Sequence, residues 1–481
     1  MDEIEVPSSP SIIGARWLRA ANLLDEDRGW MSPGWLQISG SGEILQVSSL
    51  PPSDIETSTV ERLTGVVVPG FANLHSHVHQ RALAGHAERK TSGRRGDNFW
   101  DWREVMYRML NRLDADAFEA VASLAFMEML KTGFTTIGEF HYLHHQENGD
   151  PYDDRAELVD RILAAQEQSG IGLCLLPVLY RTGGIGRPPD DGQRRFVSRS
   201  PAEYFELMDV AGARLENIPL ANLGAAPHSL RAVSADELLE LVEWWRTVAA
   251  HSPIHMHISE QLREVDEILG AYGQRPISWL ADHIGIDRNW TLIHATHADE
   301  SELQSILDAG ATVSLCPVTE GNLGDGIFPF PNLSHQRIAW GIGTDSNVRI
   351  DAVEEIRQLE YSQRLRQHRR SILTGVDDPR VGSPGRTAVE AISHIAEQSL
   401  GHRSGRFKPG YRADLVVLDD SHPALEDHGL DSVLDALLVS GDRSCISDVM
   451  VSGRWVVRDR HHFEEEAIIS KWRAVRSHVL S

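Results

Sequence analysis

The stretch Gly70-Phe71-Ala72-Asn73-Leu74-His75-Ser76-His77 follows an apolar run at 66–68 and ends in two histidines separated by one residue. Alternate side chains of a strand point to the same side, so His75 and His77 can bind one ion from one direction. Neutral imidazole is a ligand that zinc and similar transition ions favour. The stretch therefore predicts a strand that carries part of a metal site at its C-terminal end.

Three later segments end in the same kind of residue. His257, His294 and Asp345 each close a predominantly apolar run with the character of a strand. One histidine alone is more often a satisfied polar residue than a ligand, but chance does not account for an ordered set at strand ends. A carboxylate such as Asp345 can bind an ion and also accept a proton from water. Together with the first pair, these residues predict the site of a divalent-metal hydrolase.

A further carboxylate lies close to the predicted site. Glu260 follows His257 by three residues, one step beyond the end of its strand. There it can pass protons to a leaving nitrogen, as a general acid or base does. The alternative is a charge that stabilises the N-terminus of the next helix. Both interpretations stand on the sequence alone.

The middle of the chain alternates short β-type runs with amphipathic helical stretches, which is the pattern of a parallel sheet with helical crossovers. Helices are predicted at 114–131, at 238–250 behind the capping box 234–237, and at 299–309. Eight repeats imply an α/β fold, a closed (β/α)₈ TIM barrel whose chemistry collects at the C-terminal strand ends. All candidate ligands fall at such ends. The candidate strands are 65–73, 135–140, 172–180, 221–227, 253–258, 290–294, 311–317 and 338–343.

The two ends of the chain have a different character. Residues 11–68 and the tail contain short alternating segments separated by Gly and Ser, and 464–479 has the pattern of a closing amphipathic helix. Neither end has enough strands to bury a core alone, so the two are predicted to form one small β-sandwich domain. We expect this composite domain at 1–69 and 405–481, and the barrel at 70–404.

Composition restricts the possible partners. The chain has 46 basic and 70 acidic residues, a net charge of −24, which disfavours nucleic acid and anionic membranes. No run approaches the roughly 20 apolar residues of a membrane span. The acidic N-terminus lacks the features of a signal peptide, so a cytoplasmic location is expected. Cys174, Cys316 and Cys445 lie far apart in apolar contexts and are interpreted as buried thiols.

The histidines and carboxylates resemble those of the amidohydrolase superfamily, specifically its mononuclear deaminase branch. That branch shares His-x-His on strand one, His followed three residues later by Glu on strand five, His on strand six and Asp on strand eight. It lacks the bridging lysine of the binuclear branch, and the fourth candidate strand here ends at 224–229 without a lysine. The segment 410–416 and the flanking sandwich are also typical of the superfamily. The resemblance implies one metal ion per chain, Zn²⁺ or another divalent transition metal.

The resemblance extends, over nearly the whole chain, to the formimidoylglutamate deiminase family. The segments that carry it are His75-Ser76-His77-Val78-His79-Gln80-Arg81, Phe99-Trp100-Asp101-Trp102-Arg103, Gly138-Glu139-Phe140-His141-Tyr142-Leu143-His144, Gly192-Gln193-Arg194-Arg195-Phe196 and Ala226-Pro227-His228-Ser229-Leu230-Arg231. The resemblance implies that zinc is bound by His75, His77, His257 and Asp345. It implies that the catalytic residues are Glu260, His294 and Asp345. It implies that the substrate is bound by Gln80, Arg103, Tyr142, His228 and Arg231.

The residues themselves also favour an anionic substrate. Guanidinium groups pair bidentately with carboxylates, so Arg103 and Arg231 favour a small dianionic molecule over a neutral purine. Each arginine taken alone is more often a surface residue. The Gly-, Pro- and Arg-rich segment 183–199 after the third strand is long enough to predict an active-site lid.

We therefore expect hydrolytic deimination of N-formimidoyl-L-glutamate to N-formyl-L-glutamate and ammonia, a step of histidine degradation. The expected partners are this small dianionic amino-acid derivative and a second copy of the chain in a homodimer. One alternative is a related mononuclear enzyme that deaminates an aminated heterocycle such as guanine or an adenosine derivative. Another is a barrel that has lost catalysis and serves as a metal-binding scaffold.

Overall fold

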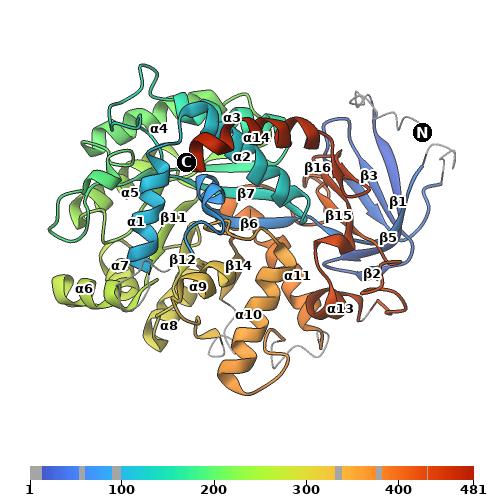
Figure 1. Cartoon of the computed structure of the whole chain (residues 1–481). Coiled ribbons are helices and arrows are strands. Elements are labelled where there is room, and N and C mark those ends of the chain that lie inside the picture. Colours follow the sequence, from blue (N-terminus) through green and yellow to red (C-terminus); the bar gives the residue numbers. More distant parts are fainter. Residues whose placement is uncertain are drawn as a thin grey trace.

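The computed structural model describes residues 14–53, 60–88, 99–330, 338–374, 382–430 and 432–480, with side chains from Trp102 onward in the third range. These residues form a parallel sheet surrounded by helices and a second, mixed sheet beside it (Figure 1). None of the described helices is long and apolar enough to cross a membrane.

The parallel sheet is the predicted barrel. Its strands follow one another around the ring in chain order. The ring closes through Ala225, whose N–H donates to Pro253 O (2.9 Å) and whose carbonyl accepts from His255 N (2.9 Å). This confirms the (β/α)₈ TIM barrel. The strands are β6 (Phe71–Ser76), β7 (Phe134–His141), β8 (Gly172–Leu179), β9 (Ala221–Leu223), β10 (Ala226–Pro227), β11 (Ile254–Ile258), β12 (Trp290–His294), β13 (Thr312–Leu315) and β14 (Ala339–Ile342).

The helices that cover the barrel begin where the sequence places caps. Asp114 accepts from Ala117 N, and Ser234 and Asp299 each form a capping box with the glutamate three residues later. The α-helices are α1 (Phe99–Leu110), α2 (Ala115–Leu130), α3 (Glu157–Ser169), α4 (Pro201–Leu215), α5 (Ala235–Val248), α6 (Leu262–Tyr272), α7 (Pro276–His283), α8 (Glu300–Ala309), α9 (Pro317–Leu323), α10 (Ala352–Gln367), α11 (Pro384–His394), α12 (Ala396–Leu400), α13 (Val433–Ser440) and α14 (Glu465–Leu480). Short 3₁₀ turns are η2 (Val78–Leu83), η3 (Asp191–Gln193) and η5 (Arg443–Cys445).

The second sheet is built from both ends of the chain, as predicted. Strands from the two ends lie together on one side of the barrel (Figure 1) and join where β5 pairs with β15, with Val67 opposite Val417. The sheet is curled: Glu43, just before β4, forms an antiparallel bridge with Arg412, just before β15. The curled sheet encloses a small hydrophobic core of its own. Its strands are β1 (Arg16–Asp25), β2 (Gly29–Met31), β3 (Gly34–Ile38), β4 (Ile44–Ser48), β5 (Glu61–Pro69), β15 (Leu415–Leu418), β16 (Ile446–Val451), β17 (Arg454–Arg458) and β18 (His461–His462).

The structure corrects the first predicted strand. The sequence predicted one barrel strand at 65–73, but 61–69 belongs to the curled sheet as β5 and the barrel begins with β6. Gly70 separates the two, and a Cβ there would lie 2.3–2.9 Å from the Thr135 side chain. The close approach of the Thr135 side chain thus favours glycine at the corner.

We propose to keep the division of the chain at 1–69 with 405–481 and at 70–404. The sheet assignments of β5, β6 and β15 support it. Parts of both units, including 1–13, 54–59, 89–98 and 331–337, lie outside the described residues.

Candidate active site

Three imidazole rings and one carboxylate converge at the C-terminal end of the barrel. The Nε2 atom of His75 lies 3.1 Å from Nε2 of both His77 and His257. Oδ1 of Asp345 lies 3.4 Å and 3.3 Å from the Nε2 atoms of His75 and His77. All four side chains are buried. Ligand atoms around a tetrahedral zinc ion with bonds of about 2.0–2.1 Å are about 3.3 Å apart, so these spacings suit such an ion.

The protonation of these rings also suits a metal ion. His77 Nδ1 donates to Phe140 O (3.0 Å), which leaves Nε2 with its lone pair toward the other ligands. Burial and the neighbouring His77 lower the pKa of His75 to about 3, and burial lowers the pKa values of His77 and His257. Neutral imidazoles and an ionised carboxylate that face one point are the donor set of a divalent metal ion.

Two residues of the site have a left-handed backbone. The φ angles are 70° for His294 and 45° for Asp345, values uncommon outside glycine and often found at functional sites. Hydrogen bonds hold Asp345 in this conformation: its N–H donates to His75 O (2.9 Å) and its carbonyl accepts from His77 N (2.9 Å). The ends of β6 and β14 are thereby fixed in one register.

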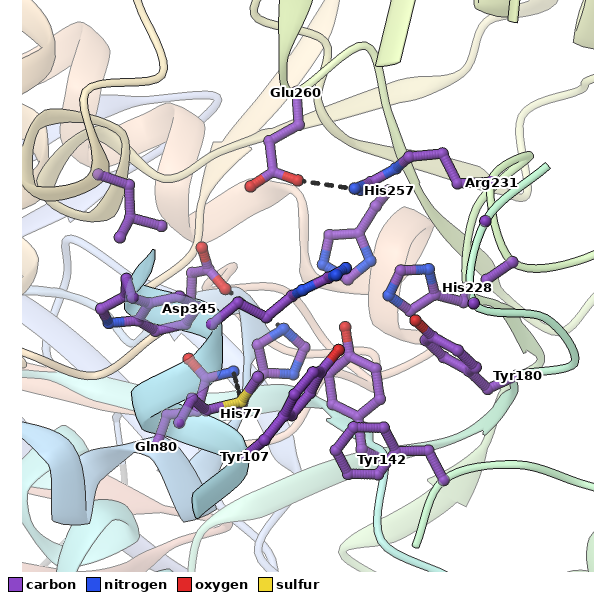
Figure 2. A pocket seen from close by; sticks show the side chains of 18 of the residues that line it. His77, Gln80, Tyr107, Tyr142, Tyr180, His228, Arg231, His257, Glu260 and Asp345 are labelled. Carbon is purple, nitrogen blue, oxygen red and sulfur yellow. Dashed lines mark hydrogen bonds and ion pairs between the residues drawn. The ribbon is translucent and has the colours of Figure 1, made fainter. Parts of the chain in front are cut away.

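A buried network joins the metal-ligand group to Glu260. His294 Nε2 lies 3.8 Å from Asp345 Oδ2 and 4.0 Å from Glu260 Oε1. On its other side, Glu260 Oε2 accepts from Arg231 Nη2 (3.2 Å), as Figure 2 shows. Burial raises the pKa of Glu260 in spite of His294 and Arg231. A buried carboxyl group with a raised pKa is suited to hold and release a proton near neutral pH.

The sequence analysis did not select two glutamates that support this network. Glu320 accepts from His294 Nδ1 (3.2 Å) and from Cys316 N (2.9 Å), so it orients the His294 ring. Glu264 accepts from the backbone N–H groups of Ser259 (3.1 Å) and Glu260 (3.2 Å). Each lies in the first turn of a helix that follows a barrel strand. An acidic residue in that turn is the signal that could have identified them.

All predicted site residues lie around one cavity. The cavity has a volume of about 780 Å³, part of it open to solvent. His75 lies beneath it, and the other predicted residues line it. Their contributions to metal binding, catalysis and substrate binding stay predictions. Figure 2 shows the polar ends of His228, Arg231 and Glu260 around the interior of the cavity.

Several residues that the sequence analysis did not assign to the site also line this cavity. Tyr107, from α1, and Tyr180, at the end of β8, face its interior (Figure 2). Arg187, from the predicted lid segment 183–199, lies at its rim and pairs with Glu267 (3.3 Å). Tyrosines scattered over different elements give no pattern in the sequence, so only the fold reveals that they share one wall.

Comparisons with known proteins cover almost the whole chain. The model of the amidohydrolase family matches residues 66–456. A formimidoylglutamate deiminase of Pseudomonas aeruginosa is 44% identical over 91% of this chain and 94% of that protein. A 5-methylthioadenosine/S-adenosylhomocysteine deaminase of Natronomonas pharaonis is 30% identical over 88% of each. The crystal structure of an amidohydrolase from Brucella melitensis has a TM-score of 0.88 and 38% identity, and the match covers 97% of this chain and 100% of that one.

Proposed function

The chain belongs to the amidohydrolase family, and from this premise we propose that it hydrolyses N-formimidoyl-L-glutamate to N-formyl-L-glutamate and ammonia. The observation that carries the proposal is the position of Arg231. Its guanidinium group lies in the cavity beside Glu260, next to the metal-ligand group. A substrate carboxylate bound there would place the neighbouring carbon–nitrogen bond at the residues that transfer protons.

The charge of the cavity supports a dianionic substrate. Arg103, Arg187 and Arg231 all line it, although the chain as a whole has a net charge of −24. A local cluster of cations within an acidic protein indicates selection for an anionic ligand. The name of the Pseudomonas relative supports the same substrate, which would place the chain in histidine degradation.

We propose zinc as the metal, held by His75, His77, His257 and Asp345. A divalent ion bound there would lower the pKa of water and polarise the formimidoyl group. The identity of the ion is open to direct test by elemental analysis. A homodimer and a cytoplasmic location stay predictions from the sequence.

The side chains divide the proton transfers between them. Glu260, whose pKa burial raises, acts as the acid and gives a proton to the imine nitrogen. Asp345 stays ionised, because its hydrogen bond with His75 lowers its pKa against the effect of burial, and it accepts a proton from the attacking water. As the carbon–oxygen bond forms, His294, oriented by Glu320, donates toward the developing oxygen charge.

The collapse of the adduct completes the balance. The proton on Asp345 passes to the amine nitrogen, the carbon–nitrogen bond breaks and ammonia leaves. The hydroxyl proton of the adduct returns to Glu260, and the carbonyl of N-formyl-L-glutamate forms. Every proton that enters the reaction therefore leaves in a product or returns to its donor.

The second candidate is a deaminase of an aminated heterocycle. The 30% identical relative of Natronomonas, whose name specifies an adenosine derivative, favours it. The arginines that line the cavity argue against it, since a neutral purine has no carboxylate with which Arg103 or Arg231 could form a bidentate pair. The experiment is ammonia release by the zinc-reconstituted protein from N-formimidoyl-L-glutamate, guanine and 5-methylthioadenosine. Release from the first alone supports the proposal, and release from a purine alone would replace it. Release from none of the three would favour a scaffold or another substrate.

A further inference from the structure

Gln193 lies behind the cavity wall, in contact with Tyr107 and Tyr180, and the proposed reaction does not use it. It belongs to the segment 192–196 of the predicted lid, and its side chain is fully buried. Its Oε1 accepts from Asp190 N (2.9 Å). A backbone N–H can only donate, so this contact fixes which end of the amide is oxygen. Nε2 therefore faces the other way and donates to Tyr180 Oη (2.7 Å) and Tyr107 Oη (3.3 Å).

The direction of these hydrogen bonds determines where a tyrosine proton points. The Tyr180 oxygen accepts from Gln193, and a hydrogen bond with Tyr107 also holds it. Burial raises the pKa values of both phenols, so both keep their protons. A hydroxyl group that accepts from Gln193 directs its own proton to a different partner, which for Tyr180 is Tyr107 or a group in the cavity. For Tyr180 the open direction is the interior of the cavity, toward which Figure 2 shows its oxygen.

Tyr180 and Tyr142 lie at different depths of the cavity. The Tyr142 ring lies 4.6 Å from the ring of His77, one of the proposed metal ligands. The Tyr180 ring lies 6.4 Å from the Tyr142 ring and 4.6 Å from the His228 ring, and Arg103, Arg231 and Asp190 are among the charges that act on it. The guanidinium carbon of Arg103 lies 5.5 Å from the centre of the Tyr107 ring. Tyr107, Tyr180 and Arg103 therefore form a cationic, hydrogen-bonding wall away from the metal ligands.

The segment that carries Gln193 is anchored to the barrel. Arg195 is fully buried, and its guanidinium group donates to the carbonyl groups of Leu113 (2.8 Å) and His145 (3.0 Å) and to that of Leu110. Phe196 N donates to Gln193 O (2.9 Å). This part of the predicted lid is thus a fixed wall, and Gln193 is held in one place relative to both tyrosines.

We propose that Gln193 is a positioning residue that fixes Tyr180 as a hydrogen-bond donor to the substrate carboxylate further from the formimidoyl carbon, and that Tyr180 and Arg103 together determine specificity for a dicarboxylate. The proposal rests on the proposed function. It assigns the nearer carboxylate to Arg231, which contacts Glu260, and the farther one to the wall formed by Tyr107, Tyr180 and Arg103. Two anionic groups thus bind at two sites separated along the cavity.

The first test compares two substrates in Tyr180→Phe. N-formimidoyl-L-glutamate has both carboxylates, and N-formimidoyl-L-2-aminobutyrate lacks the farther one. The variant should lose the hydrogen bond from the Tyr180 hydroxyl to the farther, charged carboxylate. KM for the glutamate derivative should therefore rise about ten-fold or more, with a smaller change in kcat. For the aminobutyrate derivative, kcat/KM should stay within about two-fold of the wild type, since the bond is absent there already. Tyr204→Phe is the matched control, because Tyr204 is a buried phenol that donates to Pro177 O (3.0 Å) outside the cavity.

The second test reverses the polarity of Gln193. In Gln193→Glu a carboxylate can still accept from Asp190 N and so preserve the turn, but it accepts from the Tyr180 hydroxyl and draws the proton away from the substrate. KM for the glutamate derivative should rise at least as much as in Tyr180→Phe. In the double variant the two effects should not add, because both remove the same hydrogen bond.

The outcomes separate this inference from the proposed function. If the wild type releases no ammonia from N-formimidoyl-L-glutamate, the proposed function is wrong, and the inference, which rests on it, is wrong as well. If the wild type is active and Tyr180→Phe leaves KM unchanged, or changes kcat/KM equally for both substrates, the inference alone is overturned. Additive effects in the double variant would also overturn the positioning role of Gln193. Metal content and the unfolding midpoint of each variant show whether it folds. If Gln193→Glu does not fold, the KM values of Tyr180→Phe for the two substrates still test the role of Tyr180.

Discussion

The Glu260 carboxyl group accepts a hydrogen bond from Arg231 and lies 4.0 Å from His294 Nε2. Its pKa therefore depends on these two neighbours as well as on burial. The sequence placed it three residues after His257, but the alternatives of proton donor and helix-terminal charge stayed open. The structure supports the first, because the Glu260 side chain points into the cavity and Glu264 accepts from the backbone N–H groups at this turn. At the residue scale, the spacing in the sequence predicted which side chains meet. The supporting roles of Glu264 and Glu320 could be recognised only in the folded structure.

Glu260→Gln should retain the metal and lose turnover. Glutamine keeps the size of the side chain but cannot give a proton to the imine nitrogen, so kcat should fall by at least about 10²-fold. Glu260 lies outside the group of proposed ligands, so metal content measured by elemental analysis should match the wild type. Near-normal turnover, or loss of the metal, would remove Glu260 from this role.

Arg231→Met should weaken the reaction of the dianionic substrate selectively. Removal of one partner of a buried charge pair costs roughly 2–5 kcal/mol in transition-state binding. Arg231 also pairs with Glu260 (3.2 Å), so some loss should be common to every substrate. The diagnostic quantity is the ratio of kcat/KM for N-formimidoyl-L-glutamate to that for a formimidoyl amine without carboxylates. This ratio should fall at least about ten-fold. An unchanged ratio would show that Arg231 acts only through Glu260.

At the scale of elements, strand ends and helix caps could be predicted from the sequence, and one strand boundary was missed. The apolar runs and caps placed β12, α2 and α8 almost to the residue, and the helix predicted at 238–250 is α5 at 235–248. The strand prediction at 65–73 ran through Pro69-Gly70, a turn signal in the sequence at the point where the chain passes from the curled sheet to the barrel. A single glycine marks it, and its steric reason appears only when Thr135 is placed beside it.

Gly70→Ala should destabilise the fold. The added Cβ would lie 2.3 Å from Thr135 Oγ1, and overpacking of this kind costs about 1–3 kcal/mol. Gly270→Ala is the matched control: a Cβ there meets nothing within 4 Å, and alanine in the last turn of α6 should stabilise by up to about 1 kcal/mol. Denaturant unfolding of both variants measures the difference. Equal stability of Gly70→Ala and the wild type would show that the corner can relax.

At the scale of the molecule, histidines join the outer segments to the base of the barrel. His402 Nε2 donates to Leu173 O (2.9 Å), and His462 Nε2 donates to Ser169 O (2.9 Å). Burial lowers the pKa of His402 to about 3 and that of His462 to about 4. Neither histidine could be identified from the sequence. A histidine that donates to a backbone carbonyl needs no particular residue near it in the sequence, so it forms no recognisable motif.

These histidines should make the stability depend on pH. The unfolded chain binds protons at histidine below about pH 6.5, whereas the folded protein does not until near pH 4 or lower, so the free energy of unfolding should fall as the pH drops below about 6.5. Each such histidine contributes up to about 1.4 kcal/mol per pH unit. His402→Gln keeps a donor for Leu173 O without the titrating group, so denaturant unfolding between pH 6.5 and 4.5 should show a shallower decline. Parallel curves for wild type and variant would exclude His402 as a contributor.

The whole molecule places a metal-ligand group, proton-transfer residues and cationic groups in one cavity. We therefore expect hydrolysis that depends on a single metal ion. The most direct measurement is ammonia release from N-formimidoyl-L-glutamate by demetallated protein titrated with Zn²⁺. Activity should be lost on demetallation and should return linearly up to about one ion per chain, the number that four ligands for one tetrahedral centre can hold. Activity that survives demetallation, or that requires two tightly held ions per chain, would contradict the account.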